Sequence, residues 1–339
     1  MIDLRSDNVS GVAPEIIAAI AAANTGSALG YGGDALTARL RERVGEVFER
    51  DAEIFPVVSG TAANALALAA VCRPWGAVYC HQSAHVHNTE CAAAEFFTGG
   101  AKLLPLGGEN HKIGLRELQT SLAEAGFGQP QRAQPCALSL TQATDFGTVY
   151  RPEEIAALAE SVHRHGMRVH MDGARLANAL AALGCTPAEM TWRAGVDVLS
   201  LGATKNGAMN ADAIVAFHPD IAAELRFRCR RGGHVPSKMR FLSAQLIAYL
   251  EDGLWLRLAQ RANRAAALIA AGVAGIAGIE LVAPVEVNEV FLRGSEAAFA
   301  RAEQQGLQFY RRPRGTIRLV TSFQTTETDA QRCVELLRG

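Results

Sequence analysis

Strand-like apolar runs alternate with helical segments over most of the chain, and this alternation constrains the fold more than any other feature. Short apolar runs lie at 54–58, 77–80, 102–106, 137–140, 169–171 and 212–217. Longer segments with helical composition lie between them, for example at 115–125 and 152–165. Strands that alternate with helices are typical of a mostly parallel sheet with helices on both faces, so we expect an α/β fold.

The pattern changes beyond about residue 275. Short strand-like runs follow at 280–282, 288–293 and 316–320, and the composition of 327–337 predicts a closing helix. A chain of 339 residues is long enough for about two domains. We therefore expect a large α/β domain at 1–250 and a small α+β domain at 251–339, with the extreme N-terminus packed on the small domain.

The composition is that of a globular protein that acts on small molecules. Hydrophobic residues make up 49% and charged residues 20%. The formal net charge of -1 and the pI of about 6.8 provide no basic field for nucleic acid or anionic lipid. The charged N-terminal residues 1–7 lack the apolar core of a signal peptide, and the run at 265–279 is shorter than the roughly 20 residues of a membrane span. We expect a cytoplasmic protein.

The cysteines predict neither a disulfide framework nor a zinc site. There are 7 of them, an odd number, and none are spaced as C-x-x-C. We expect most to be small core residues.

Two segments suggest a cofactor. The apolar run that begins at Val196 ends in a glycine-rich turn that carries Lys205, whose neighbours are small residues rather than carboxylates. Lys205 is a candidate nucleophile, although a solvated loop lysine is the common alternative. Upstream, a short strand at 168–172 ends on Asp172 and a tight turn. Pyridoxal phosphate requires this pair, because a lysine takes its aldehyde and an acidic group keeps its pyridine nitrogen protonated. Both residues fall at carboxyl ends of strands, where such groups gather.

A phosphate site is predicted at the start of the next helical segment. Ser59, Gly60 and Thr61 lie where the strand ending at Val58 gives way to an alanine-rich helix. Glycine lets backbone amides approach an anion, and the helix N-terminus favours negative charge. The alternative is an ordinary N-cap formed by Ser59 or Thr61.

The remaining candidate side chains follow strands or lie on loops. The segment 81–87 contains three histidines, at 81, 85 and 87, but no carboxylate or cysteine lies at zinc-like spacing nearby. We therefore expect no metal and favour an imidazole on the cofactor ring. Arg318 lies on a predicted strand and would suit a substrate carboxylate, or would face water at a strand edge. Tyr31 and Asp34 lie on a glycine-rich loop that either lines a site or forms a plain turn.

Taken together in chain order, these motifs resemble those of the low-specificity L-threonine aldolases, which are fold-type I pyridoxal-phosphate enzymes of the β-eliminating lyase group. The matching segments run from residue 3 to residue 321: DLRSD at 3–7, YGxD at 31–34, SGTxxN at 59–64, AH at 84–85, HxDGAR at 170–175, TKNG at 204–207 and IRLVT at 317–321. The resemblance implies the aspartate aminotransferase fold (fold type I). This fold has a mostly parallel sheet of the seven-stranded type and a smaller C-terminal α+β domain.

The resemblance also implies roles in cofactor binding. Lys205 would hold pyridoxal 5′-phosphate as a Schiff base, Asp172 would pair with its pyridine nitrogen, and His85 would stack on its ring. Arg175 would lie near its phenolic oxygen. Its phosphate would be bound at the helix start by Ser59, Gly60 and Thr61.

Substrate contacts and assembly are implied in the same way. Ser6, Arg175 and Arg318 would hold the amino-acid carboxylate. The family forms dimers that pair into tetramers with active sites at the dimer interface, so Tyr31 and Arg240 would reach the site of a neighbouring subunit. The implied reaction is retro-aldol cleavage of a β-hydroxy-α-amino acid, such as L-threonine or L-allo-threonine, to glycine and an aldehyde.

One segment departs from the family pattern. Many members carry a histidine after the central strand, whereas residues 139–145 contain none here. The base for the β-hydroxyl group is therefore open. His85 is favoured, with a bound water, Thr144 or His87 as helpers.

Three alternatives follow from the same residues. A related lyase acting on β-aryl-serines, or by β-elimination, would share every cofactor contact. A nicotinamide oxidoreductase would need a G-x-G-x-x-G motif after the first strand, which 59–64 does not supply. A catalytically inactive scaffold would be favoured if Lys205 or Asp172 were absent, and both are present.

Overall fold

The computed structural model describes residues 1–339 and has a central sheet of 7 strands in the order β2-β8-β7-β6-β5-β3-β4. The strands are β2 (Glu53–Val57), β3 (Gly76–His81), β4 (Lys102–Leu106), β5 (Gln134–Thr141), β6 (Arg168–Gly173), β7 (Val198–Leu201) and β8 (Asp212–Ala216). β4, β3, β5, β6 and β7 run parallel to one another, and β8 is antiparallel to both β7 and β2. The mostly parallel sheet predicted from the alternation is confirmed.

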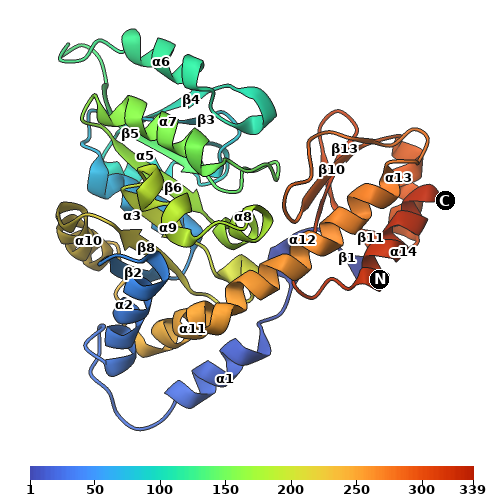
Figure 1. Cartoon of the computed structure of the whole chain (residues 1–339), viewed down its shortest axis with the longest axis horizontal. Helices are drawn as coiled ribbons and strands as arrows, with labels where there is room; N and C mark the ends of the chain where they lie inside the picture. Colours follow the sequence, from blue (N-terminus) through green and yellow to red (C-terminus); the bar gives the residue numbers. More distant parts are fainter.

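Helices cover both faces of this sheet (Figure 1). Successive strand side chains point to opposite faces. Accordingly, Val198 packs in the core beneath α3 and α10, whereas Leu199 packs in the larger core on the other face. The helices of the sheet region are α1 (Pro14–Ala23), α2 (Ala35–Phe48), α3 (Gly60–Val71), α4 (His85–Asn88), α5 (Ala93–Thr98), α6 (Leu115–Ala123), α7 (Pro152–His163), α8 (Leu176–Leu183), α9 (Pro187–Met190), α10 (Pro219–Arg231) and α11 (Arg240–Leu250).

Local signals account for where several helices begin. Asp34 caps α2, where its Oδ1 accepts a hydrogen bond of 2.8 Å from the backbone N–H of Thr37. Proline occupies the first turn of α1, α7 and α10, where its missing N–H costs nothing. These signals are visible in the sequence without any tertiary contact.

The C-terminal part is built on a second, antiparallel sheet and one long helix. α12 (Leu254–Val273) leads to the strands β9 (Glu280–Leu281), β10 (Glu289–Arg293), β12 (Tyr310–Arg312) and β13 (Thr316–Val320), in the order β12-β13-β10-β9. The helices α13 (Glu296–Gln304) and α14 (Glu327–Arg338) complete this part. Both chain ends lie beside it in Figure 1. The N-terminus is held there because β1 (Ile2–Asp3) pairs in parallel with β11 (Leu307–Gln308), and the C-terminus follows α14.

α12 joins the two parts of the molecule. Its first half, including Leu254 and Leu258, packs in the core of the central sheet, and its second half, including Ile269 and Val273, packs with Leu4 in the C-terminal core. We retain a division near residue 250 as a proposal, since one continuous helix contributes to both cores.

The cysteines differ from the expectation in one respect. Cys72, after α3, and Cys136, on β5, form a disulfide with their Cα atoms 5.6 Å apart, although 64 residues separate them in the chain. Their spacing carries no signal because the fold alone brings them together. Cys80, Cys229 and Cys333 are buried thiols. No helix of the protein combines the length and the apolar character that crossing a membrane requires.

Candidate active site

A cavity of about 250 Å³ lies where several strands of the central sheet end. Thr141, Asp172 and Leu201, at the carboxyl ends of β5, β6 and β7, contribute to its wall. Open α/β sheets bind ligands at this edge. The cavity brings together every residue that the sequence predicted for cofactor binding: Ser59, Gly60, Thr61, His85, Asp172, Arg175 and Lys205.

One end of the cavity fits a phosphate group. Ser59 is the N-cap of α3 and accepts a hydrogen bond of 3.3 Å from the backbone N–H of Ala62, which leaves the N–H groups of Gly60 and Thr61 without partners in the helix. A Cβ added at Gly60 would meet nothing within 4 Å, so the space beside this helix start is open. The buried hydroxyl of Thr204, which lines the same cavity, also has no hydrogen-bond partner. These groups are donors arranged around an anion site.

Asp172 is a buried carboxylate without an ion-pair partner. It is 3% exposed at the end of β6. Its Oδ2 accepts a hydrogen bond of 2.9 Å from Asn64 Nδ2, and its Oδ1 accepts one of 3.0 Å from the backbone N–H of Ala174. A buried negative charge is costly unless a cation compensates it. The position of Asp172 therefore suits a protonated ring nitrogen in the cavity.

His85 is connected to Asp172 through two buried side chains. Its Nδ1 lies 2.7 Å from Glu90 Oε1, which also accepts a hydrogen bond of 2.8 Å from Asn64 Nδ2. The hydrogen bond to Glu90 raises the pKa of His85, and burial raises the pKa of Glu90. The buried Glu90 thus orients the imidazole at the mouth of the cavity. No group of three or more His, Cys, Asp or Glu side chains is arranged to hold a metal ion.

Lys205 lies on the short 3₁₀ helix η4 (Thr204–Asn206), which follows β7. Its side chain is partly buried and forms no salt bridge. The turn is rigidly held, because Asp212 Oδ1 accepts hydrogen bonds from the backbone N–H groups of Ala203 (2.8 Å) and Thr204 (3.0 Å). A primary amine without a carboxylate partner, on a rigid turn facing the cavity, is suited to bond with a carbonyl.

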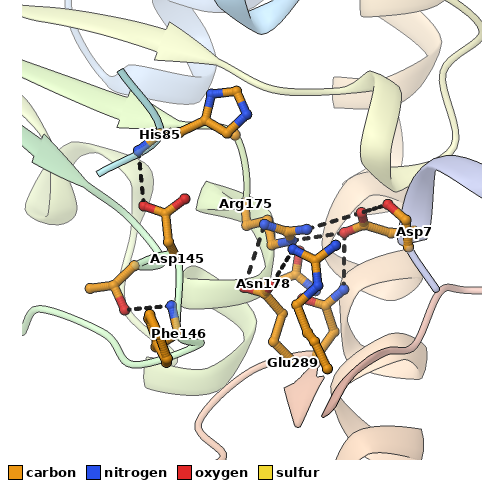
Figure 2. Close-up of polar contacts among 12 residues, drawn as sticks. Asp7, His85, Asp145, Phe146, Arg175, Asn178 and Glu289 are labelled. Carbon is orange, nitrogen blue, oxygen red and sulfur yellow. Dashed lines mark hydrogen bonds and ion pairs between the residues drawn. The ribbon is translucent and has the colours of Figure 1, made fainter. Parts of the chain in front are cut away.

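Arg175 is held by Asp7 from the N-terminal segment (Figure 2). Its Nε and Nη2 donate to the two carboxylate oxygens of Asp7 at 2.8 and 3.0 Å, and Asn288 Nδ2 donates to Asp7 at 3.1 Å. Arg175 Nη1 lies 3.4 Å from Glu289 Oε2. Burial alone would raise the pKa of Asp7, but Arg175 and Lys205 outweigh it and lower that pKa. Much of the donor capacity of Arg175 is therefore used within the protein.

The predicted substrate residues Ser6, Arg318 and Tyr31 do not line this cavity. Ser6 is buried and caps the 3₁₀ helix η1 (Asp7–Val9). Arg318 lies 3.9 Å from Glu289 and donates to the carbonyl of Arg5 at 3.3 Å, while its Nε has no partner. Tyr31 is 58% exposed, and Arg230 lies over its ring at 4.9 Å. Within a single chain, Tyr31 is away from the site.

Comparison with known proteins identifies the family. The model of the β-eliminating lyase family matches residues 3–297. The low-specificity L-threonine aldolase of Pseudomonas aeruginosa is 44% identical over 98% of this chain and 95% of its own. The chain belongs to the β-eliminating lyases and, within them, to the low-specificity L-threonine aldolases. It is accordingly a lyase that uses pyridoxal 5′-phosphate.

Solved structures place this aldolase in fold type I. The threonine aldolase of Leishmania major has a TM-score of 0.92 at 27% identity, covering 100% of this chain and 99% of its own. Aspartate aminotransferase of Thermus thermophilus has a TM-score of 0.72 at 16% identity, covering 99% and 91%, and shows the fold alone. The fold expected from the sequence is confirmed.

The cavity of this aldolase fits pyridoxal 5′-phosphate on structural grounds. The unpaired amides at the start of α3, the orphan hydroxyl of Thr204 and the uncompensated carboxylate of Asp172 match a phosphate at one end and a cationic ring nitrogen at the other. Lys205 faces the same space.

Sequence reasoning about the aldolase missed three acidic residues of the site. Glu90, Asp145 and Glu289 are close to the cavity or to its arginines, but none was assigned a role. Asp145 is the one that the sequence could have indicated, because it follows the end of β5 in the loop where the sequence departs from the family pattern. Glu289 carries no such signal, because the sequence does not distinguish a buried glutamate on a short strand from a glutamate that faces water.

Proposed function

We propose that the enzyme cleaves L-threonine, L-allo-threonine and related β-hydroxy-α-amino acids to glycine and an aldehyde, which is acetaldehyde for threonine. The observation that carries the proposal is the cavity that joins Lys205, Asp172 and His85 to an anion-binding helix start. The near full-length similarity to the Pseudomonas aeruginosa low-specificity L-threonine aldolase supports the same substrate class.

Residues of the chain take distinct roles in this proposal. Lys205 attaches the cofactor, Asp172 faces its ring nitrogen, and His85 lies on its ring. When bound, pyridoxal phosphate supplies an acceptor for the electrons of the bond that breaks. The phosphate is held at the start of α3 by Ser59, Gly60 and Thr61.

Arg318 keeps more free donor capacity for the substrate carboxylate than Arg175, although Arg175 is the one that lines the cavity. The Nε of Arg318 is buried without a partner, and its carboxylate neighbour Glu289 is 3.9 Å away, so donor groups remain free. Burial lowers the pKa of Arg318, and an approaching carboxylate would compensate the poorly solvated guanidinium. Arg175, fixed by Asp7, would add a second and rigid donor, and Ser6 would assist from the adjoining N-terminal turn. Holding the carboxylate fixes the direction of the Cα–Cβ bond.

We further propose that the enzyme acts in the cytoplasm as a homodimer or homotetramer, with Tyr31 and Arg240 directed to a neighbouring subunit. Large apolar side chains exposed to solvent support an interface: Leu29 (76%), Tyr31 (58%), Phe96 (79%) and Phe227 (78%). Val58, which lines the cavity, is 47% exposed. Light scattering of the purified protein measures its mass, and a monomer would contradict the proposed assembly.

The test of function combines a spectrum with a product assay. The wild-type protein should be yellow, its visible band should change on addition of glycine, and it should release acetaldehyde from L-threonine. Borohydride reduction should fix the cofactor to wild-type protein but not to the Lys205→Ala variant, which should remain folded by circular dichroism. Reducible labelling that persists in Lys205→Ala would refute the assignment of Lys205. A yellow wild-type protein that releases no aldehyde from threonine would refute the proposed reaction.

A further inference from the structure

Asp145 is a carboxylate of the cavity whose second oxygen has no protein partner. It lies in the loop after β5, and its Oδ2 accepts a hydrogen bond of 3.1 Å from the backbone N–H of His85. No other donor of the chain contacts this carboxyl group, and no lysine or arginine forms a salt bridge with it. Figure 2 shows the carboxyl group directed toward the start of α4, where His85 lies. Oδ1 is therefore free to accept a proton or a hydrogen bond.

The strand order places Asp145 in the middle of the site. β5 lies between β3 and β6 in the sheet, and Thr141 at the end of β5 is opposite Asp172 on β6. His85 follows β3, Asp145 follows β5, and Lys205 follows β7. Because these parallel strands end at one edge, Asp145, His85, Asp172 and Lys205 all line the same cavity.

The loop that carries Asp145 is rigid. The hydroxyl groups of Thr144 and Thr148 are 2.7 Å apart, and the backbone N–H of Thr144 donates to the carbonyl of Thr148 at 2.9 Å. The ring of Phe146 stacks on His111, with centroids 3.5 Å apart, and on Phe291 at 4.5 Å. A carboxylate on such a loop is preorganised, as a group in proton transfer needs to be.

The charges around Asp145 make its carboxylate a stronger base than an ordinary aspartate. Burial in the cavity, with the negative charges of Asp172 and Glu289, raises the pKa of Asp145 to about 7. The cations that face it from neighbouring elements reduce this effect: His85, Lys205 and Arg175. A base is most effective when its pKa lies near the working pH.

His85 is less suited to accept the hydroxyl proton. Its Nδ1 is engaged with the buried Glu90 at 2.7 Å, and this contact raises the pKa of the imidazole. An imidazole that retains its proton and is held by Glu90 is suited to position the cofactor ring rather than to accept a proton. Asp145, by contrast, is a cavity carboxylate beside His85 with an unoccupied acceptor atom.

We propose that Asp145 is the general base that takes the proton of the substrate β-hydroxyl group on its Oδ1. The inference rests on the proposed aldolase function. The O–H electron pair forms the carbonyl of the aldehyde, the Cα–Cβ bond breaks, and its electron pair stays with Cα. Cα then takes up one proton to complete glycine, and Asp145 returns to the carboxylate, so protons and electrons balance without a further reactant.

The test compares Asp145→Asn with Asp220→Asn as a control for the loss of one negative charge on an exposed helix position. The amide oxygen of the Asp145→Asn side chain would still accept the hydrogen bond from the His85 amide, so the loop should hold its shape. We expect kcat/KM for L-threonine to fall by about 10²- to 10⁴-fold in Asp145→Asn and to stay unchanged in the control. The wild-type rate should rise with pH through about 7 as the carboxyl group ionises, and this limb should vanish in Asp145→Asn.

Two measurements do not depend on turnover. Difference infrared spectra of the cofactor-free protein should show a carboxyl group that ionises near pH 7 in wild-type protein and not in Asp145→Asn. Above pH 7, wild-type protein should bind a β-hydroxy amino acid more tightly than L-2-aminobutyrate, and the variant should lose this preference. Retention of the borohydride-reducible label would show that Asp145→Asn is folded and loaded.

Two results would overturn the inference in distinguishable ways. If wild-type protein cleaves threonine and Asp145→Asn cleaves it equally, with the same pH limb, the aldolase function stands and Asp145 is not the base. If wild-type protein binds glycine but does not cleave threonine, the proposed function fails and the role of Asp145 fails with it, even where the carboxyl titration is observed.

Discussion

The buried pair of Asp7 and Arg175 should contribute strongly to stability, and replacing Asp7 with asparagine tests this. Asp7 is 2% exposed and binds Arg175 through both carboxylate oxygens, at 2.8 and 3.0 Å. It also accepts a hydrogen bond from Asn288 in the C-terminal part of the molecule. The substitution keeps the shape of the side chain but removes its charge and turns an amide N–H₂ toward the guanidinium.

The structure sets the size of the expected effect. Breaking a buried ion pair typically costs about 3–5 kcal/mol, because one charge is left without compensation. Here Glu289 Oε2 remains 3.4 Å from Arg175 Nη1 and compensates part of the charge. We therefore expect Asp7→Asn to lower the free energy of unfolding by about 2–4 kcal/mol at neutral pH.

The pH dependence follows from the lowered pKa of Asp7. A carboxyl group with a depressed folded-state pKa contributes stability above its unfolded-state pKa, and this contribution is lost as the pH falls through the folded-state value. The deficit of Asp7→Asn should accordingly be largest near neutral pH and should shrink in acid.

The assay is urea unfolding of cofactor-free protein at fixed protein concentration, followed by circular dichroism. Asp3→Asn is a matched control, because Asp3 also contacts one arginine through both oxygens, with Arg5 Nη2 at 2.6 Å, but at the surface. Surface pairs are weak, so its loss should be small. Equal losses for the two variants would refute the reasoning that burial determines the strength of the Asp7 contact.

Two further predictions concern the geometry around Lys205 and His85. Gly202→Ala should destabilise the protein by about 1–3 kcal/mol, because the added Cβ would lie 2.5 Å from the backbone oxygen of Ala174. Gly45→Ala is the control: its added Cβ would have no neighbour nearer than 3.7 Å, so this variant should be neutral or stabilised. Equal urea unfolding midpoints for the two variants would contradict this. Glu90→Gln should lower the pKa of His85, because the hydrogen bond that the imidazole donates to the Glu90 carboxylate is what raises it. NMR titration of the cofactor-free protein checks this, and an unchanged pKa would show that Glu90 does not tune the imidazole.

The sequence by itself determined the features that depend on neighbouring residues. The alternation of apolar runs predicted the parallel sheet, because the period of burial is a local property of each strand and helix. Ser59 at a helix start, and Asp172 and Lys205 at strand ends, could be placed for the same reason. Because parallel strands end at one edge of a sheet, the topology alone predicted that these three residues would meet in a single cavity.

Tertiary structure decided which polar groups are already satisfied and which remain free. Arg175 was expected to bind substrate, yet Asp7, 168 residues away in the chain, occupies two of its donors. Asp145 received no role from the sequence, although the fold leaves one of its oxygens free within the cavity. The disulfide between Cys72 and Cys136 likewise depends on a distance that spacing does not encode. Hydrogen bonds, burial and charge pairing join residues far apart in the chain, so they exist only once the chain has folded.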